Sequence, residues 1–471
     1  MVRYLRGFMF LHLWPAALIF ADEGRIDLKP LQDQDYIPPK AKAVTSKLLT
    51  AQQKDAKVFY FETIVFQGCT VLSDTDQKRL IKPYLKKKIC LNDLNNLIMA
   101  IHVAYGDAGY VLENVYFKKE SFKKPRHLVM FLVEPKVCAL RIFERRKRGR
   151  RVNNLIKVDA DNVLKVTDWQ CASDILRQLE TFSAHKFRLN TDRERTYHTA
   201  DVMLKKGQTC AFGLGYDNQG SKNTGRDRYT IQARFEDVLG MFEQWQFTHI
   251  TTHDPFSKDR YSQTSLVSLS VPYRRWRASF YGIFEKDKHP ITNRAFSKTE
   301  QIQLGADLRY ALSKSWTSGT YVGSTIEHYS KSRYLNGHRL SILSGDVTKW
   351  ILWGSHYRYI FGGVVYGKLS YSQGIHASDM GMGSYFPKNF KKLNINGFFQ
   401  RNFGSRWLWT LSGDVQIGEP KLFEHEKFSL GGTSTIRGFF SPQYQTDSGF
   451  FIRNELEYLL DFLQKSFYKN R

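Results

Sequence analysis

The residues of this chain with the clearest chemical potential lie in its C-terminal part, from Phe428 to Tyr458. There a glycine pair precedes a lone Arg437, and a turn-rich run leads into a segment with the charged residues Arg453, Glu455 and Glu457 at odd positions. A guanidinium in a poorly solvated site is stabilised by a charge-assisted fork to a carboxylate. The pattern therefore predicts binding rather than catalytic chemistry, with Arg437, Glu455 and Glu457 as the charged candidates.

The segment that carries these acids alternates like a strand with one polar and one apolar face. In residues 451–460 the even positions are mostly apolar, so Glu455 and Glu457 face the lumen of a barrel if the even positions face lipid. Similar alternation continues from about Gln208, in roughly ten-residue segments bounded by turn-forming residues. This is typical of a transmembrane β-barrel, although a soluble β-sandwich alternates as well.

Composition favours the barrel over other classes. Hydrophobic residues make up 42% of the 471 residues and the mean hydropathy is -0.43, which is too polar for a membrane-spanning helix bundle. Aromatic residues reach 14%, and barrels concentrate such rings at the two membrane interfaces. A net charge of +25 and the basic run from Arg145 to Arg151 would suggest nucleic acid. The charge is spread through the other segments too, so we expect no nucleic-acid partner.

The first residues indicate export. Residues 1–21 have the charged start, the apolar core and the small final residue of a signal peptide, and their core is shorter than a spanning helix requires. Residues 22–57 read as a linker with one helical piece. An oxidising compartment permits disulfides, and Cys69–Cys90 and Cys138–Cys171 are possible pairs, although spacing alone cannot establish either. Cys210 would be left over.

Two small α+β domains are expected between the linker and the barrel. Residues 58–134 show the order strand, helix, helix, strand, strand, with helices that begin near Ser73 and near Asn92 or Asp93. Residues 135–206 repeat the pattern more weakly, with one clear helix. An exposed sheet edge and an adjoining helix groove in such modules can accept a strand from an extended polypeptide.

The sequence LGGxxxIRGF, followed by Gly449 and the letters NELEY, resembles the signature of outer-membrane transporters that join POTRA domains to a β-barrel. The closest resemblance is to their two-partner-secretion branch, the haemolysin-activator and filamentous-haemagglutinin-transporter type. Residues 58–134 are similar to its first POTRA domain through Cys90-Leu91, Asp93-Leu94 and Tyr105 with Gly109-Tyr110-Val111. The lumen-loop motif comprises Gly431, Gly432, Ile436, Arg437, Gly438 and Phe439. The resemblance implies that this loop enters the barrel lumen and that Arg437 is held there by acidic groups of the inner wall, with Glu455 and Glu457 as possible partners.

The resemblance implies a mixed fold, with two POTRA domains (58–134 and 135–206) before an antiparallel barrel (207–471) whose lumen loop is 418–448. By its position, the segment 22–57 would hold a plug helix and the linker to the POTRA domains. It further implies a monomeric pore in the outer membrane of a Gram-negative bacterium, with the POTRA domains in the periplasm. Its partners would be outer-membrane lipid and a large secreted exoprotein, recognised through that protein's N-terminal secretion domain. A barrel-assembly factor that inserts other proteins is the alternative.

One departure from the family concerns the end of the chain. Family barrels have about sixteen strands, whereas we count about twelve here, and a Phe-x-Asp-x-Gly strand does not follow residue 460. An open sheet edge in lipid leaves backbone groups unsatisfied. We therefore expect a truncated barrel with impaired activity, and a smaller closed barrel is the alternative.

The sequence does not predict an enzyme. His356, His376 and His425 lie far apart and read as solvated surface, and neither GxSxG nor HExxH occurs. The cysteines form no metal motif. We expect no catalytic residues, no metal and no cofactor, and export without nucleotide hydrolysis.

Overall fold

The computed structural model describes residues 59–117, 127–143, 155–156, 162–191, 198–252, 260–375, 389–431, 435 and 444–458, except positions 219, 222, 293, 316 and 405. The predicted leader (1–21), the predicted linker (22–57) and the basic run 145–151 lie outside these residues. The described residues form two compact units: the α/β elements from β1 to β8, and the sheet from β9 onward together with the short segment Gln178–Thr181.

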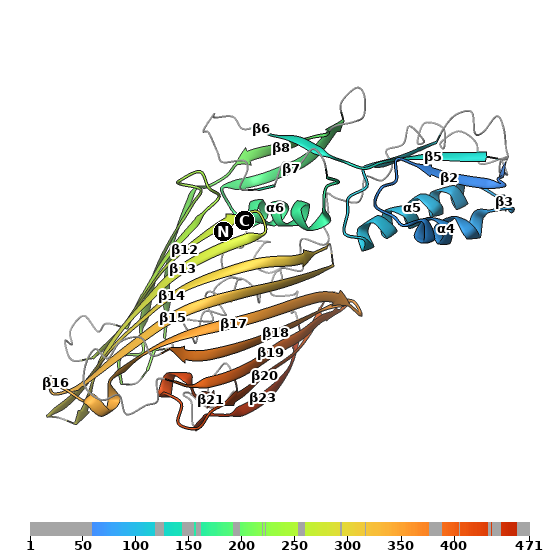
Figure 1. The fold of residues 1–471 in the computed structure, drawn as a ribbon. Helices are drawn as coiled ribbons and strands as arrows, with labels where there is room; N and C mark the ends of the chain where they lie inside the picture. Colours follow the sequence, from blue (N-terminus) through green and yellow to red (C-terminus); the bar gives the residue numbers. More distant parts are fainter. Residues whose placement is uncertain are drawn as a thin grey trace. The chain divides into compact units, whose positions relative to one another are not determined.

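The first α/β domain has the predicted order of elements. Its strands and helices are β1 (Phe59–Tyr60), β2 (Thr63–Gln67), α4 (Asp74–Ile81), the short helix η3 (Lys82–Tyr84), β3 (Lys88–Ile89), α5 (Leu91–Asp107), β4 (Asn114–Phe117) and β5 (His127–Val133). The sheet order is β2-β5-β4, with β2 parallel to β5, and α4 and α5 lie together on one side of it (Figure 1). The first predicted strand is split into β1 and β2, and Phe61 between them is fully buried in the core.

Local sequence explains the helices of this domain. The Ser73 hydroxyl accepts a hydrogen bond from the Asp76 amide and so caps α4. The Asp93 carboxylate accepts one from the Cys90 amide at 2.8 Å and so closes the first turn of α5. Apolar residues three or four apart on α5, namely Leu94, Leu97, Ile101 and Tyr105, are buried in the core.

A second α/β domain follows in the same unit. It comprises β6 (Val137–Phe143), α6 (Val166–Gln178), β7 (Phe182–Thr191) and β8 (His198–Lys206), with sheet order β6-β8-β7. Its single helix and the strand at its start agree with the sequence pattern. Backbone hydrogen bonds join the two domains, since the Val111 amide donates to the Leu164 carbonyl and the Val166 amide to the Gly109 carbonyl.

The described residues of the other unit form a large antiparallel sheet of 13 strands, as the alternation predicts, and a separate pair of short strands. In the part of the chain that the structure describes, β16 lies off the main path and the remaining strands of the sheet agree with the estimate of about twelve. Within the described residues β9 and β23 are its two end strands. The strands are β9 (Cys210–Asp217), β10 (Arg228–Glu236), β11 (Gln244–Thr251), β12 (Tyr261–Tyr273), β13 (Trp276–Thr292), β14 (Ala295–Lys314), β15 (Ser318–Leu335), β16 (His338–Arg339), β17 (Gly345–Ile360), β18 (Gly363–Ile375), β19 (Lys391–Phe403), β20 (Trp407–Gly418) and β23 (Gly449–Tyr458).

The sheet curves, and its two faces differ as the period-2 pattern requires (Figure 1). On β14 the even-numbered Ile302, Leu304 and Leu308 are exposed, whereas the odd-numbered Gln303 and Thr299 are buried on the opposite, concave face. The short helix η6 (Ser341–Leu343) follows β16. Among the described residues, no helix is both long enough and apolar enough to span a bilayer.

Candidate functional site

A loop between β20 and β23 turns back onto the concave face of the sheet. It contains the short helix η7 (Glu424–Glu426) and the strands β21 (Phe428–Leu430) and β22 (Tyr444–Thr446), which pair with each other. The Asp447 carboxylate accepts hydrogen bonds from the amides of Lys421 at 3.0 Å and Leu422 at 2.9 Å. Asp447, which lies just before β23, thus ties the end of the loop to its start just after β20.

The start of this loop is fixed first by apolar packing. Leu422 and Phe423 are almost completely buried, in one cluster with Tyr329, Val347 and Phe390. Burying side chains of this size contributes roughly 1.5–3 kcal/mol each. The loop therefore begins with a hydrophobic attachment to the wall, and we call residues 422–428 the loop anchor.

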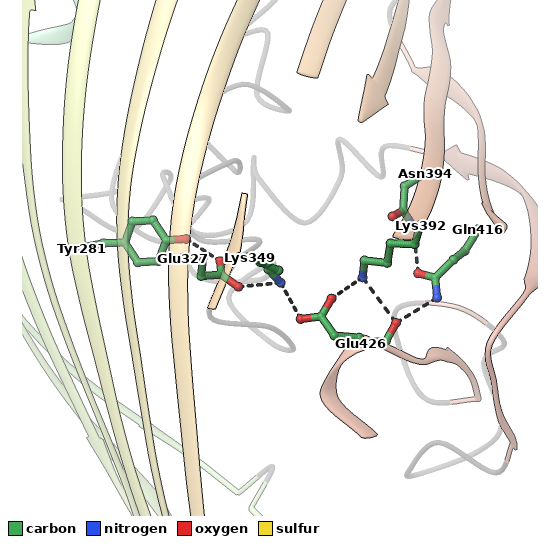
Figure 2. Close-up of polar contacts among 7 residues, drawn as sticks. All are labelled: Tyr281, Glu327, Lys349, Lys392, Asn394, Gln416 and Glu426. Atoms are coloured by element: carbon green, nitrogen blue, oxygen red, sulfur yellow. Dashed lines mark hydrogen bonds and ion pairs between the residues drawn. The ribbon is translucent and has the colours of Figure 1, made fainter. Parts of the chain in front are cut away.

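An ion-pair network holds the same segment (Figure 2). One carboxylate oxygen of Glu426 lies 2.6 Å from Lys349 Nζ on β17, and the other lies 2.6 Å from Lys392 Nζ on β19. The main-chain carbonyl of Glu426 accepts a hydrogen bond from the side-chain amide (Nε2) of Gln416 on β20 at 2.9 Å. A single loop residue thereby connects three strands of the wall.

The network continues across the wall beyond Glu426. Lys349 Nζ is also 2.6 Å from the Glu327 carboxylate on β15, which accepts a 2.6 Å hydrogen bond from the Tyr281 hydroxyl on β13. Figure 2 shows this chain of contacts running from Tyr281 to Lys392. Because acidic and basic groups alternate, each buried charge is neutralised by a neighbour, and removing one member would leave its partner uncompensated.

The network also sets the protonation of the anchor. Burial by itself would raise the pKa of Glu426, but the ammonium groups of Lys349 and Lys392 outweigh it and hold that pKa well below the usual range. Burial lowers the pKa of His425 to about 4. The His425 ring stacks on Tyr329 with their centroids 3.9 Å apart, and is therefore neutral at physiological pH. Near neutral pH, Glu426 is therefore ionised and His425 is neutral, and both protonation states stabilise the attachment of the loop anchor to the wall.

The position of His425 corrects one sequence-based expectation. His425 was expected on solvated surface, but it is half-buried against Tyr329. Glu327, His425 and Glu426 also bring possible metal-ligating atoms within 4.8 Å of one another. Lys349 nevertheless lies 2.6 Å from both carboxylates and already supplies the positive charge a metal would bring.

Most of the predicted lumen-loop motif lies outside the described residues, including Gly432, Ile436, Arg437, Gly438 and Phe439. Gly431 is described and adopts a positive φ of 106°, which favours glycine. On β23 the Glu455 carboxylate lies 2.6 Å from Arg453, whereas Glu457 is exposed. The acidic partner of Arg437 therefore stays a prediction, and Glu455 already has a cation beside it.

The possible disulfide between Cys69 and Cys90 is wrong, because both thiols are free. The Cys69 sulfur instead accepts a hydrogen bond from the buried Tyr105 hydroxyl at 3.2 Å. Cys171 is buried on α6, and the side chain of Cys138 lies outside the described part of the chain, so that pairing stays a prediction. Cys210 is exposed and free.

Sequence reasoning missed the anchor itself. Its lysines lie on separate strands, and single-sequence patterns do not show which strands meet. A signal was present in the run from Glu424 to Glu426, where two carboxylates directly precede the loop motif.

Comparisons with known proteins agree with this architecture. Residues 200–469 match the family model "Haemolysin secretion/activation protein ShlB/FhaC/HecB", and residues 59–126 match the model "POTRA domain, ShlB-type". The outer membrane transporter CdiB of Escherichia coli O6:K15:H31 is 23% identical over 427 residues, which cover 88% of this chain and 72% of CdiB. The hemolysin transporter protein HpmB of Proteus mirabilis is 22% identical, over 84% of this chain and 71% of HpmB.

The fold is similar to that of a solved structure. The structure of CdiB from Escherichia coli aligns with a TM-score of 0.72 at 21% identity, over 86% of this chain and 77% of that protein. The structure of CdiB from Acinetobacter baumannii aligns with a TM-score of 0.63 at 14% identity.

Proposed function

The chain belongs to the family of haemolysin secretion/activation proteins, and we propose that its loop anchor holds the re-entrant loop in the pore and sets the closed state. Members of this family are outer-membrane transporters of two-partner secretion, which export partner exoproteins by way of POTRA domains. The protein is accordingly an outer-membrane translocation pore of a Gram-negative bacterium. This family function takes precedence over the alternative of a barrel-assembly factor.

The observation that carries the proposal is the double ion pair of Glu426. With 1% of its surface exposed, Glu426 contacts Lys349 and Lys392 at 2.6 Å each. A carboxylate this deeply buried between two cations is costly to release, on the order of 3–5 kcal/mol when one partner is lost. The anchor is therefore a firm attachment of the loop to the wall.

Other parts of the function are proposed from the sequence. The domains 58–134 and 135–206 capture the N-terminal secretion domain of the exoprotein, and the strands from residue 207 form a monomeric pore in contact with outer-membrane lipid. Arg437 provides a second attachment of the loop to an inward carboxylate. Passage needs no catalytic residue, metal, cofactor or nucleotide.

Secretion of the partner exoprotein from cells that express the full chain tests the proposal. We expect Glu426→Gln to lower secretion at least about tenfold at equal outer-membrane abundance, because the loop base loses its two ion pairs. Glu424→Gln is the matched control, since the Glu424 side chain is 49% exposed and its ion pair with Lys331, at 2.8 Å, lies at the surface end of the network. Equal secretion by the two variants would refute the role of the anchor while leaving the family assignment intact.

A further inference from the structure

Two aromatic side chains on the concave face reach across one strand to a carboxylate on the strand beyond it. The Tyr281 hydroxyl on β13 donates a hydrogen bond to Glu327 on β15 at 2.6 Å, as Figure 2 shows. The Trp353 indole on β17 donates one to Asp307 on β14 at 3.0 Å. In the sheet order β17-β15-β14-β13, each contact therefore passes over an intervening strand.

These hydrogen bonds fix the direction of both rings. Neighbouring strands lie about 4.8 Å apart, so a contact with the second strand along spans about 10 Å of the wall. A ring that pointed to the centre of the lumen could not make such a contact. The Trp353 indole also donates to the Thr325 hydroxyl at 3.2 Å, on the strand that it crosses. Tyr281 and Trp353 thus lie flat along the wall.

A glycine lies beneath each ring. Gly305 on β14 is paired directly opposite Tyr281. Gly323 on β15 is paired directly opposite Trp353. A Cβ on either glycine would overlap with the ring atoms, well inside van der Waals contact. Neither glycine has a positive φ, so the backbone conformation does not require it. The space that the ring occupies is therefore the reason for a glycine at both positions.

A third pair repeats the arrangement further along β15. Gly319 lies four residues before Gly323, and thus on the same face of the strand, and is paired directly opposite Tyr357 on β17. A Cβ at Gly319 would lie 2.6 Å from the half-buried Tyr357 ring. Glycine inside a strand weakens a sheet and often marks a close approach of another group. Three such pairs on one face therefore indicate a role for the flat rings themselves.

A displaced ring would move into the lumen, because the space along the wall is filled. Tyr281 packs in one buried cluster with Leu266 and Ile283, which lie on the same face of the sheet. Trp353 is only 5% exposed. Lys368 Nζ lies 4.5 Å from the centroid of the Trp353 ring, and its flexible side chain yields more readily than the strand beneath the ring.

We propose that Gly305 and Gly323 set the clearance of the export path, because each allows an inward aromatic ring to lie flat on the lumen wall. The inference rests on the pore function of the family and not on the role of the loop anchor. An extended polypeptide with its side chains is about 10 Å thick, the spacing of stacked sheets. A side chain at either glycine would lift the ring by about 3.5 Å, the contact distance of carbon atoms, which is about a third of that thickness.

Planar-bilayer recordings of the full chain test the proposal at Gly323, because Trp353 donates to Asp307 and not to a member of the ion-pair network. We expect Gly323→Ala to lower the conductance of the largest open level by at least about a tenth, since the lifted indole narrows the lumen. The double variant Gly323→Ala, Trp353→Ala should recover the wild-type level. Gly367→Ala on β18 is the matched control and should match the wild type, because a Cβ at Gly367 would meet no other atom of the described residues within 4 Å.

Trp353→Ala alone keeps the glycine and provides a second test. A ring that lies flat occupies little of the lumen, so its removal should change the same conductance by less than about a tenth. A larger rise would overturn the proposal, because the ring would then project into the lumen.

Two further results would also overturn it. One is a wild-type conductance of Gly323→Ala, which would mean that the ring only stiffens the wall. The other is a double variant whose conductance stays as low as that of Gly323→Ala, because the narrowing would then not come from the ring. Heat-modifiable migration on gels shows which variants are folded. The opening frequency of Glu426→Gln reports separately on the loop anchor, since the proposal concerns only the size of the open level.

Discussion

Glu426 and Lys349 are 77 residues apart in the sequence, and their side chains meet at 2.6 Å on the concave face of the sheet. The contact joins the start of a re-entrant loop to the middle of the wall. Because Lys349 also holds Glu327, the loop and the wall share one network of buried charges.

The stability of the loop anchor should depend on Glu426 far more than on its neighbour Glu424. Glu426→Gln leaves Lys349 and Lys392 without a carboxylate between them, and we expect a loss of about 3–5 kcal/mol in the free energy of unfolding. Glu424→Gln removes a half-exposed pair and should cost no more than about 1 kcal/mol. Urea unfolding of the purified chain in detergent measures both values, and similar losses would contradict the network.

Acidification should loosen the anchor through His425. Its pKa is about 4 in the folded protein and about 6.5 in an unfolded chain. A lowered pKa means that the unfolded state binds the proton first, so stability is complete above pH 6.5 and falls as the pH drops towards 4. Glu327, Glu426, Lys349 and Lys392 surround the ring, so their charges modulate this dependence.

His425→Phe is the variant that isolates this effect. It retains an aromatic ring against Tyr329 but cannot titrate, and we expect a flatter dependence of the unfolding midpoint between pH 6.5 and 4.5. Limited proteolysis of the loop across the same range gives an independent readout. A midpoint that falls as steeply in the variant as in the wild type would assign the pH dependence to other groups.

The loop anchor also requires a glycine on the opposite strand. A Cβ at Gly449 would lie 2.5 Å from the ring of Phe428, which is buried in the anchor. We expect Gly449→Ala to destabilise the protein by about 1–3 kcal/mol through overpacking. Adding Phe428→Leu should recover part of that loss, as a double-mutant cycle would show. No recovery would mean that the glycine serves the backbone of β23 instead.

The wall could be predicted from the sequence because its signal is local. The alternation of Ile302, Leu304 and Leu308 with polar residues specifies a strand with one lipid-facing side, and neighbouring segments repeat it. The helices of the first α/β domain are likewise specified by their capping residues and apolar spacing. These patterns depend only on residues a few positions apart.

The anchor could not be predicted, because it depends on the register of distant strands. Glu426 meets Lys349 and Lys392 only when β17, β19 and the loop take their places together. His425 was misjudged because it stands between two glutamates, a context that reads as solvated surface. The expected clamp joined a loop arginine to wall acids, whereas the described part of the loop offers an acid to wall lysines.

Planar-bilayer conductance of the full chain tests the central claim most directly. If the double ion pair of Glu426 holds the loop in the pore, Glu426→Gln should show frequent large openings under conditions in which the wild type and Glu424→Gln stay mostly closed. The Glu426→Gln protein should also admit larger neutral polymers into the pore. The account would be contradicted by a Glu426→Gln protein whose conductance and opening frequency equal those of the wild type.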